Sequence, residues 1–398
     1  MSPPIRLSSP SALFLSLPLA LGLSFGIASP ALADAERGPA DRGPADRGPA
    51  DRLEADLRAF FAGEGTLEIG EVSSALLRSR VTAEDLRFES HDGERLSVEH
   101  YIVHGDYDRP DEVTLEGIRL EAFLDEPGVM SIEQVVLNDP GRAVPPRDEE
   151  ALAEQWQGSL ALSGLNLELD AGTVATLASL RLDGGLEDGN GGLWVETLAL
   201  DLAKMIDMAP EEERTRLRMV SNVLTDGSGE LQLDAVFRGE WQEGESHAVL
   251  LSDSEITLRD ALRLVLDVEL PLVLPEGAEP AELFDDSDLM EDATLLGGDI
   301  RLIIGDEGLF GRLATLGAAM GGVTEAQYLE QARTQAQGFG MMFGPQVQSI
   351  LMGLVALLEG NASELEIAVG LPAESNLATY AGDPLGLPDK LSFNVQTR

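Results

Sequence analysis

The sequence predicts a mostly β protein of the β-rich α+β class: a curved antiparallel meander of repeated hairpins with a C-terminal helical hairpin. Three observations support this fold class. One hairpin phrase is written three times, period-two alternation with frequent turn signals runs from about residue 64 to residue 305, and helical spacing takes over after that point. Repetition of one hairpin unit is typical of strands that stack in chain order and bury one shared apolar face.

The repeated phrase has two halves, each with a fixed arrangement of apolar and charged residues. The first half is an apolar-Arg-apolar triplet, and the second places a Glu between two pairs of apolar residues. The copies of the first half are Leu86-Arg87-Phe88, Ile118-Arg119-Leu120 and Leu180-Arg181-Leu182, and those of the second half are Leu96–Val103, Met130–Leu137 and Leu193–Leu200.

The apolar alternation in the second half changes phase after Glu99, Glu133 and Glu196. A strand has a period of two, so such a change requires an extra residue or a local twist. A similar phase change occurs at Gly117 and Gly164, and glycine suits a bulge because it accepts a positive φ. We therefore expect a curved sheet, and a curved sheet can wrap into a groove or a barrel.

The N-terminal region predicts export. Residues 1–33 read as a signal peptide, with Arg6, an apolar stretch from Ala12 to Ala28, and cleavage after the small-x-small triplet Ala31-Leu32-Ala33. Residues 34–52 repeat Arg-Gly-Pro-Ala-Asp and predict a disordered leader. We expect a periplasmic or secreted chain without stable membrane insertion once the signal is removed, because no later apolar span approaches the length of a membrane helix.

The β-rich domain is expected to cover residues 53–305. It opens with a short helix over residues 53–62, continues with strands from Thr66 to about Asp139, and contains a short acidic helix near residues 148–157. Further strands are expected over 159–170, 174–183, 230–238, 248–274 and 295–304, with a helix over 209–224 whose buried stripe is Leu217, Val220 and Leu224.

The C-terminal segment, residues 306–398, is expected to pack on the sheet as a helical hairpin followed by two strands. Helices are predicted over 309–319, over 324–337 after the capping box that Thr324 opens, and over 346–359. Strands are predicted over 363–370 and 391–397.

The charge of the chain is strongly negative, with 71 acidic residues against 27 basic residues and a net charge of −44. Self-repulsion of this size is relieved by salt, so we interpret the surface as adapted to a salty exterior, with a generic acidic secreted protein as the alternative. A polyanion is a poor partner for nucleic acid or for an anionic membrane. The chain has no cysteine, so no disulfide contributes to its stability.

No catalytic motif stands out, and we predict neither a cofactor nor a metal site. His100 and His104 have helical metal spacing, but their alternation places them on a strand, about 13 Å apart. Glu187, Asp188 and Asn190 lie in a hairpin loop that lacks the EF-hand offsets. The acidic cluster at Asp285, Asp286, Asp288, Glu291 and Asp292 is interpreted as a solvated loop.

The segment Gly338–Gly344 joins the last two predicted helices and supplies the candidate apolar-ligand contacts. These residues are Phe339, Met341, Met342 and Phe343. Methionine and phenylalanine between glycines make an adaptable apolar surface that suits the cover of a hydrophobic groove, whereas ordinary core is the default interpretation of such a segment.

Over residues 64–305 the repeated phrase resembles the strand segments of AsmA-like envelope proteins and related periplasmic β-rich families. The matching residues are the three copies, together with Val81-Thr82, Val113-Thr114, Gly117 and Gly164. The resemblance implies a curved sheet with an apolar inner face and a role in lipid handling or envelope maintenance. The chain departs from those families because its N-terminal segment is expected to be cleaved, which argues against a membrane-bridging role.

These features lead to one expected function and two alternatives. We expect an exported, soluble, non-catalytic protein of the cell envelope that binds a lipid, another apolar ligand or an envelope protein in its curved sheet. The alternatives are a structural or protein-interaction module with a filled core, and a hydrolase whose carboxylate pair the sequence does not mark. The sequence does not determine the oligomeric state.

Overall fold

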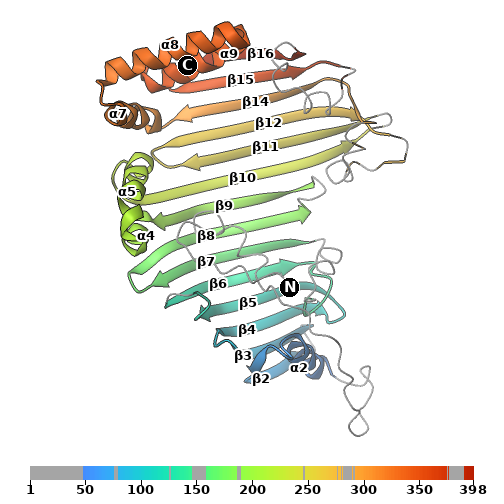
Figure 1. Cartoon of the computed structure of the whole chain (residues 1–398). Coiled ribbons are helices and arrows are strands. Elements are labelled where there is room, and N and C mark those ends of the chain that lie inside the picture. Colours follow the sequence, from blue (N-terminus) through green and yellow to red (C-terminus); the bar gives the residue numbers. More distant parts are fainter. Residues whose placement is uncertain are drawn as a thin grey trace. The chain divides into compact units, whose positions relative to one another are not determined.

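The computed structural model describes residues 48–75, 79–124, 127–145, 158–185, 190–244, 247–275, 277–278, 280, 289, 292–373, 375 and 390–398. The predicted signal peptide, most of the leader and the helix expected near residues 148–157 lie outside these residues. Within them the chain is mostly β, with strands that pair antiparallel in chain order and a pair of helices near the C-terminus (Figure 1). This confirms the predicted fold class.

The sheet contains sixteen strands among the described residues, and nearly all of them pair with their sequence neighbours. Their bounds are β1 (Gly65–Glu68), β2 (Glu71–Ala75), β3 (Arg80–Ser90), β4 (Arg95–Asp106), β5 (Arg109–Glu121), β6 (Gly128–Asn138), β7 (Ser159–Leu169), β8 (Gly172–Gly185), β9 (Asn190–Asp201), β10 (Glu230–Glu243), β11 (Ala248–Leu258), β12 (Leu262–Val273), β13 (Thr294–Leu295), β14 (Gly298–Asp306), β15 (Glu364–Leu371) and β16 (Ser392–Thr397).

The helices are α2 (Pro49–Phe60), α4 (Leu202–Met208), α5 (Glu211–Thr225), α7 (Leu309–Gly321), α8 (Glu325–Phe343) and α9 (Pro345–Leu358). Helix α2 begins inside the segment expected to be a disordered leader, because Pro49 occupies the first turn of a helix, where its missing N–H is harmless. Helix α4 had no counterpart among the predicted elements.

The chain divides into two compact units. One comprises residues 1–176 and 204–214, and the other comprises residues 177–203 and 215–398. The change from strands to helices near residue 305 is therefore not the division between compact units. Strand β15 pairs with β14 and continues the same sheet after the C-terminal helices, since Ile367 stands opposite Leu302.

In the first unit the repeated phrase corresponds to a row of backbone kinks that crosses five strands. Asp85 on β3, Gly117 on β5 and Gly164 on β7 have φ angles of 53°, 63° and 66°. Glu99 on β4 and Glu133 on β6 lie at the same level between them. Between β3 and β4 the strand pairing is interrupted at this level and then continues in the same register. Glu84 stands opposite His100 before the interruption, and Leu86 stands opposite Val98 after it.

The kinks keep apolar side chains on one face while the alternation changes phase. Val98 precedes the kink of β4 by one residue and Tyr101 follows it by two, and both are buried. The expected extra residue is absent at Glu99 and Glu133. The facing strand is kinked at the same level, so both strands use the same number of residues there and the register does not change. At Glu196, in the second unit, the expected bulge is present: the register shifts opposite Asp234, and Thr197 has a φ of 49°.

Helix α2 packs on β2 and β3 at the start of the first unit. Leu53 and Leu57 are buried there, and the ring of Phe61 lies 4.6 Å from that of Phe88. The helix therefore covers the apolar face where Leu86 and Phe88 follow the kink.

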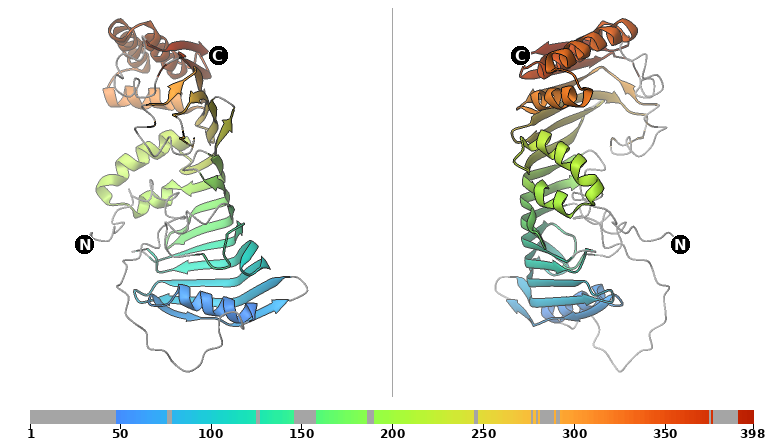
Figure 2. Two further views of the ribbon diagram at one scale, coloured as in Figure 1. Left: turned by 90° about the vertical axis from the view of Figure 1, so that its right-hand side faces the viewer. Right: turned by 60° about the vertical axis from the view of Figure 1, so that its left-hand side comes forward.

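In the second unit α9 packs on β15 and β16, and α8 packs on α9 (Figure 2). Leu357 of α9 and Leu365 of β15 are inaccessible to solvent and form the centre of this core. The capping box predicted at Thr324 is confirmed: the hydroxyl of Thr324 accepts from the backbone N–H of Gln327, whose side chain accepts from the backbone N–H of Thr324.

Helix α5 differs from its prediction in the face that it buries. The expected stripe included Val220, but that side chain is 48% exposed, and the buried residues are Ser221 and Thr225. The hydroxyl of Thr225 donates to the carbonyl of Ser221 at 2.8 Å, which satisfies this polar group inside the helix end. The burial of Val220 was wrong because helical spacing identifies a stripe without identifying what packs on it.

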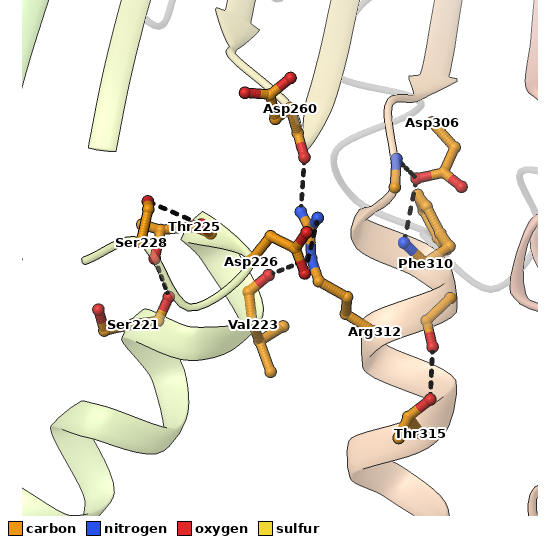
Figure 3. A network of polar contacts seen from close by, with 12 residues as sticks. Ser221, Val223, Thr225, Asp226, Ser228, Asp260, Asp306, Phe310, Arg312 and Thr315 are labelled. Atoms are coloured by element: carbon orange, nitrogen blue, oxygen red, sulfur yellow. Dashed lines mark hydrogen bonds and ion pairs between the residues drawn. The ribbon is translucent and has the colours of Figure 1, made fainter. Parts of the chain in front are cut away.

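Arg312 of α7 ties the second unit's helices to the turn between β11 and β12 (Figure 3). Its Nε donates to the carbonyl of Val223 at the end of α5, and one terminal nitrogen donates to the carbonyl of Asp260, each at 2.7 Å. The side chain is 18% exposed, and its planar guanidinium donates to both carbonyls at once.

Replacing Arg312 with alanine is expected to lower the free energy of unfolding by about 2 kcal/mol, because it removes the charged donor from the part-buried carbonyl of Val223 and from the exposed carbonyl of Asp260. Denaturant unfolding followed by circular dichroism measures the change. Arg259→Ala, at an exposed arginine of the same turn, is the matched control and is expected to stay within about 0.5 kcal/mol of the parent. An equal decrease in the free energy of unfolding in the two variants would show that the Arg312 hydrogen bonds contribute no more than an exposed arginine of the same turn.

Candidate apolar binding surface

The second unit presents an apolar face on which register aligns aliphatic and aromatic side chains across neighbouring strands. Because β-strand side chains alternate between faces, residues that pair directly share a face. The rows that make up this apolar face are Leu193, Phe237, Ser254, Leu266, Leu302, Ile367 and Val395 in one line, and Val195, Ala235, Ile256, Leu264, Ile304 and Leu365 in the next.

Two clusters cover parts of this sheet. Helix α9 buries the face over β14 to β16, where Ile367 is 9% exposed. A second cluster gathers at the opposite ends of β10 to β12, where Trp241, Leu250 and Leu272 pack with Ala293 and Leu295. Both clusters follow ordinary burial of apolar side chains and close the face in those places.

Between these covered parts the apolar face stays accessible to solvent. Leu266, in the middle of β12, is 39% exposed, and Val195, Phe237, Ile256 and Leu264 are only half-buried. Aliphatic side chains at the centre of a long strand are ordinarily buried by a second layer. Contiguous apolar surface of this kind marks a site for a ligand or a partner.

The other face of the second unit carries a ladder of ion pairs. Arg238 pairs with Asp253 at 2.8 Å, and Arg301 pairs with Glu366 at 2.8 Å and with Asp267 at 3.6 Å. The hydrogen bond from Arg301 lowers the pKa of Glu366 below its usual value. These ion pairs make this row of the face polar, in contrast to the apolar rows on the opposite face of the same strands.

A pocket of about 680 Å³ lies along the charged face, among β9 to β12 and β14. Trp194 and Leu251 give it some apolar lining, but carboxylates outnumber arginines there, with Glu240, Asp253, Asp267, Glu269 and Asp299 against Arg238 and Arg301. This composition disfavours an apolar ligand. Among the described residues no three histidine or carboxylate side chains converge as a metal site.

The first unit has a pocket of about 530 Å³ beside α2, which the sequence did not reveal. Tyr107 donates to Asp56 at 2.7 Å, and the guanidinium of Arg52, which pairs with Asp108, lies 4.6 Å from the Tyr107 ring centre. Burial and the hydrogen bond to Asp56 raise the pKa of Tyr107 well above its ordinary value. The phenol therefore stays protonated at neutral pH, which suits a positioning hydrogen bond better than general-base chemistry.

The two histidines of the H-x3-H pair lie on β4, as predicted, and do not face a shared centre. The Nδ1 atom of His100 is 3.5 Å from Glu116, whereas the Nε2 atom of His104 is 3.6 Å from Glu112. Each histidine thus has its own cross-strand carboxylate. In the loop and cluster weighed as cation sites, Glu187, Asp188, Asp285, Asp286, Asp288 and Glu291 lie outside the described residues.

The predicted apolar contacts are brought together at the end of α8, where all four side chains are exposed. Phe339, Met341, Met342 and Phe343 are 48%, 86%, 74% and 37% exposed, and the two phenylalanine rings stack at 6.1 Å. The segment is helical as far as Phe343, whereas the predicted helix stops near Gln337. Ordinary core was the wrong default here, because these side chains point to solvent.

Comparison with models of known protein families finds no match for this sequence, and comparison with characterised proteins finds none either. Among the described residues no helix has the length and apolar character needed to span a membrane. The AsmA-like resemblance accordingly stays a prediction. The apolar face of the second unit is the feature from which function is argued.

Proposed function

We propose that this chain is an exported, non-catalytic protein of the cell envelope that holds a lipid or another apolar ligand against the apolar face of its second unit. The observation that carries the proposal is the exposure of Leu266, 39%, in the middle of β12 and among half-buried apolar neighbours. An acyl chain laid across β10 to β14 covers this surface without displacing any charge.

The energetics favour an apolar occupant over water. Covering apolar surface contributes about 25 cal/mol per Å², so a single acyl chain that covers a few hundred Å² supplies several kcal/mol. The face contains Ser254 as its polar side chain beside Leu266 and Phe237, which leaves little to recognise in a polar ligand. The protein therefore selects for apolar chains and not for a particular headgroup.

Leu266→Glu tests the proposal directly. A carboxylate in the middle of the apolar face is expected to reduce the lipid that co-purifies with the chain about tenfold, as measured by native mass spectrometry and by extraction. The matched control is Val273→Glu, on the same strand but on the opposite face, where the parent side chain is 37% exposed. This variant is expected to retain the ligand.

Two outcomes would contradict the proposal. One is a parent protein that carries no lipid and binds no hydrophobic dye in its native state, which would favour a module whose interior is filled by its own side chains. The other is equal lipid in Leu266→Glu and Val273→Glu. Circular dichroism of both variants establishes that the sheet is intact before lipid is compared.

A further inference from the structure

The apolar residues at the end of α8 form a projecting tip, which we call the hairpin tip and define as Phe339, Met341, Met342 and Phe343. Gly344 ends α8 with a φ of 95°, and Pro345 starts α9. A Cβ atom at Gly340 would lie 2.4 Å from the Cβ of Gln348, so the two helices meet closely just before the turn. No room remains between them for large side chains, which are exposed instead.

Charge is absent from the whole tip end of the hairpin. From Thr334 to Leu358 the sequence contains no acidic, basic or histidine residue, although the chain carries a net charge of −44. The flanking charges neutralise each other away from the tip, where Arg333 of α8 pairs with Glu359 after α9. An exposed apolar surface without a charged rim is suited to a low-dielectric medium.

The size and shape of the tip distinguish a lipid surface from a protein partner. A stable protein interface needs about 800 Å² and 20–30 residues on each side, far more than four side chains at a helix turn provide. Association of two copies through this point also brings together two strongly negative chains. A few apolar side chains that reach about 5–10 Å into the headgroup region are sufficient for reversible binding to a bilayer.

We propose that the hairpin tip docks on the surface of an uncharged lipid bilayer. Met341 and Met342 enter the interface, and the stacked rings of Phe339 and Phe343 support them from the same helix. Zwitterionic lipid is required, because an anionic surface repels the rest of the chain. The inference goes beyond the proposed function, since the tip docks whether or not the sheet holds a ligand.

The absence of cysteine from the chain permits a probe at a single position. The Met341→Cys variant is labelled with an environment-sensitive fluorophore and titrated with phosphatidylcholine vesicles. The emission of the label is expected to shift to shorter wavelength as it enters the lipid. The matched control is Met320→Cys, labelled in the same way. Met320 is 75% exposed at the end of α7, near the start of α8, where Gly317 lies against Tyr328. The emission spectrum of the label at position 320 is expected to stay unchanged when vesicles are added.

A second substitution near the label distinguishes insertion of the hairpin tip from binding of the dye itself to the vesicle. Met342→Asp in the labelled Met341→Cys background is expected to weaken vesicle binding about tenfold, because it places a charge in the interface. An unchanged spectrum at position 341, or equal shifts at positions 341 and 320, would overturn the proposal. A shift that depends on protein concentration without vesicles would also overturn it, in favour of contact between two copies. Because the label reports the tip alone, lipid retention on the sheet is scored independently.

Discussion

Replacing both Gly117 and Gly164 with alanine is expected to lower the free energy of unfolding by about 4 kcal/mol. Each glycine has a positive φ, which costs an L residue about 1–2 kcal/mol. At each position the new Cβ would also lie 2.4 Å from the Cγ and Cδ atoms of a facing glutamate, Glu99 or Glu133. Each glutamate must then leave its place over the backbone, which adds an overpacking cost. The two sites are separated by β6, so their effects are expected to add.

The control keeps the backbone strain and removes the contact. Gly63 and Gly93 have φ angles of 86° and 89°, and a Cβ at either one meets nothing within 4 Å. Gly63→Ala/Gly93→Ala is therefore expected to cost about 2 kcal/mol by denaturant unfolding. Adding Glu99→Ala and Glu133→Ala to the Gly117→Ala/Gly164→Ala variant is expected to recover the free energy by which the two glycine pairs differ, because it removes the side chains that the new Cβ atoms contact. If the two glycine pairs cost the same, the glutamates do not constrain the kink.

The kinks also show how far the repeated phrase predicts the sheet. The phase change after Glu99 and Glu133 correctly located the irregularity along the strand. It did not reveal that Gly117 and Gly164 are the residues opposite, because strand pairing is nonlocal and one strand's sequence does not record it. At Glu196 the same phrase gives a true bulge, since Asp234 accepts from the N–H of Thr197 at 2.7 Å and accommodates the extra residue.

The candidate surfaces were predictable to different degrees for a related reason. Alternation predicts that Leu264 and Leu266 share an apolar face, as register confirms. Whether that face is covered depends on where α9 packs, which is decided by Gly353 approaching Leu365 and by other contacts distant in sequence. The same limit applies to Met341, where composition identified an apolar segment, but only the close approach of Gly340 to Gln348 explains its exposure.

The melting temperature is expected to rise by about 5 °C or more between 0.05 M and 1 M sodium chloride. Salt weakens two opposing forces: attraction within ion pairs, and repulsion among unpaired carboxylates. The pairs are mostly exposed, as in Arg238–Asp253 with side chains 55% and 52% accessible, and each such pair contributes at most about 1 kcal/mol. With 71 acidic residues against 27 basic ones, repulsion outweighs attraction, so screening stabilises the fold.

The shape of the salt response identifies its cause. The Debye length is already about 10 Å at 0.1 M and falls to about 3 Å at 1 M, so screening produces most of its effect at the lower concentrations. Exclusion of solutes from the protein surface instead increases steadily with concentration and occurs with sucrose as well. Differential scanning calorimetry in chloride and in sucrose of equal osmolality distinguishes the two. A melting temperature that stays constant or falls with chloride would contradict the interpretation of the acidic surface as an adaptation to salt, because the ion pairs would then outweigh the repulsion.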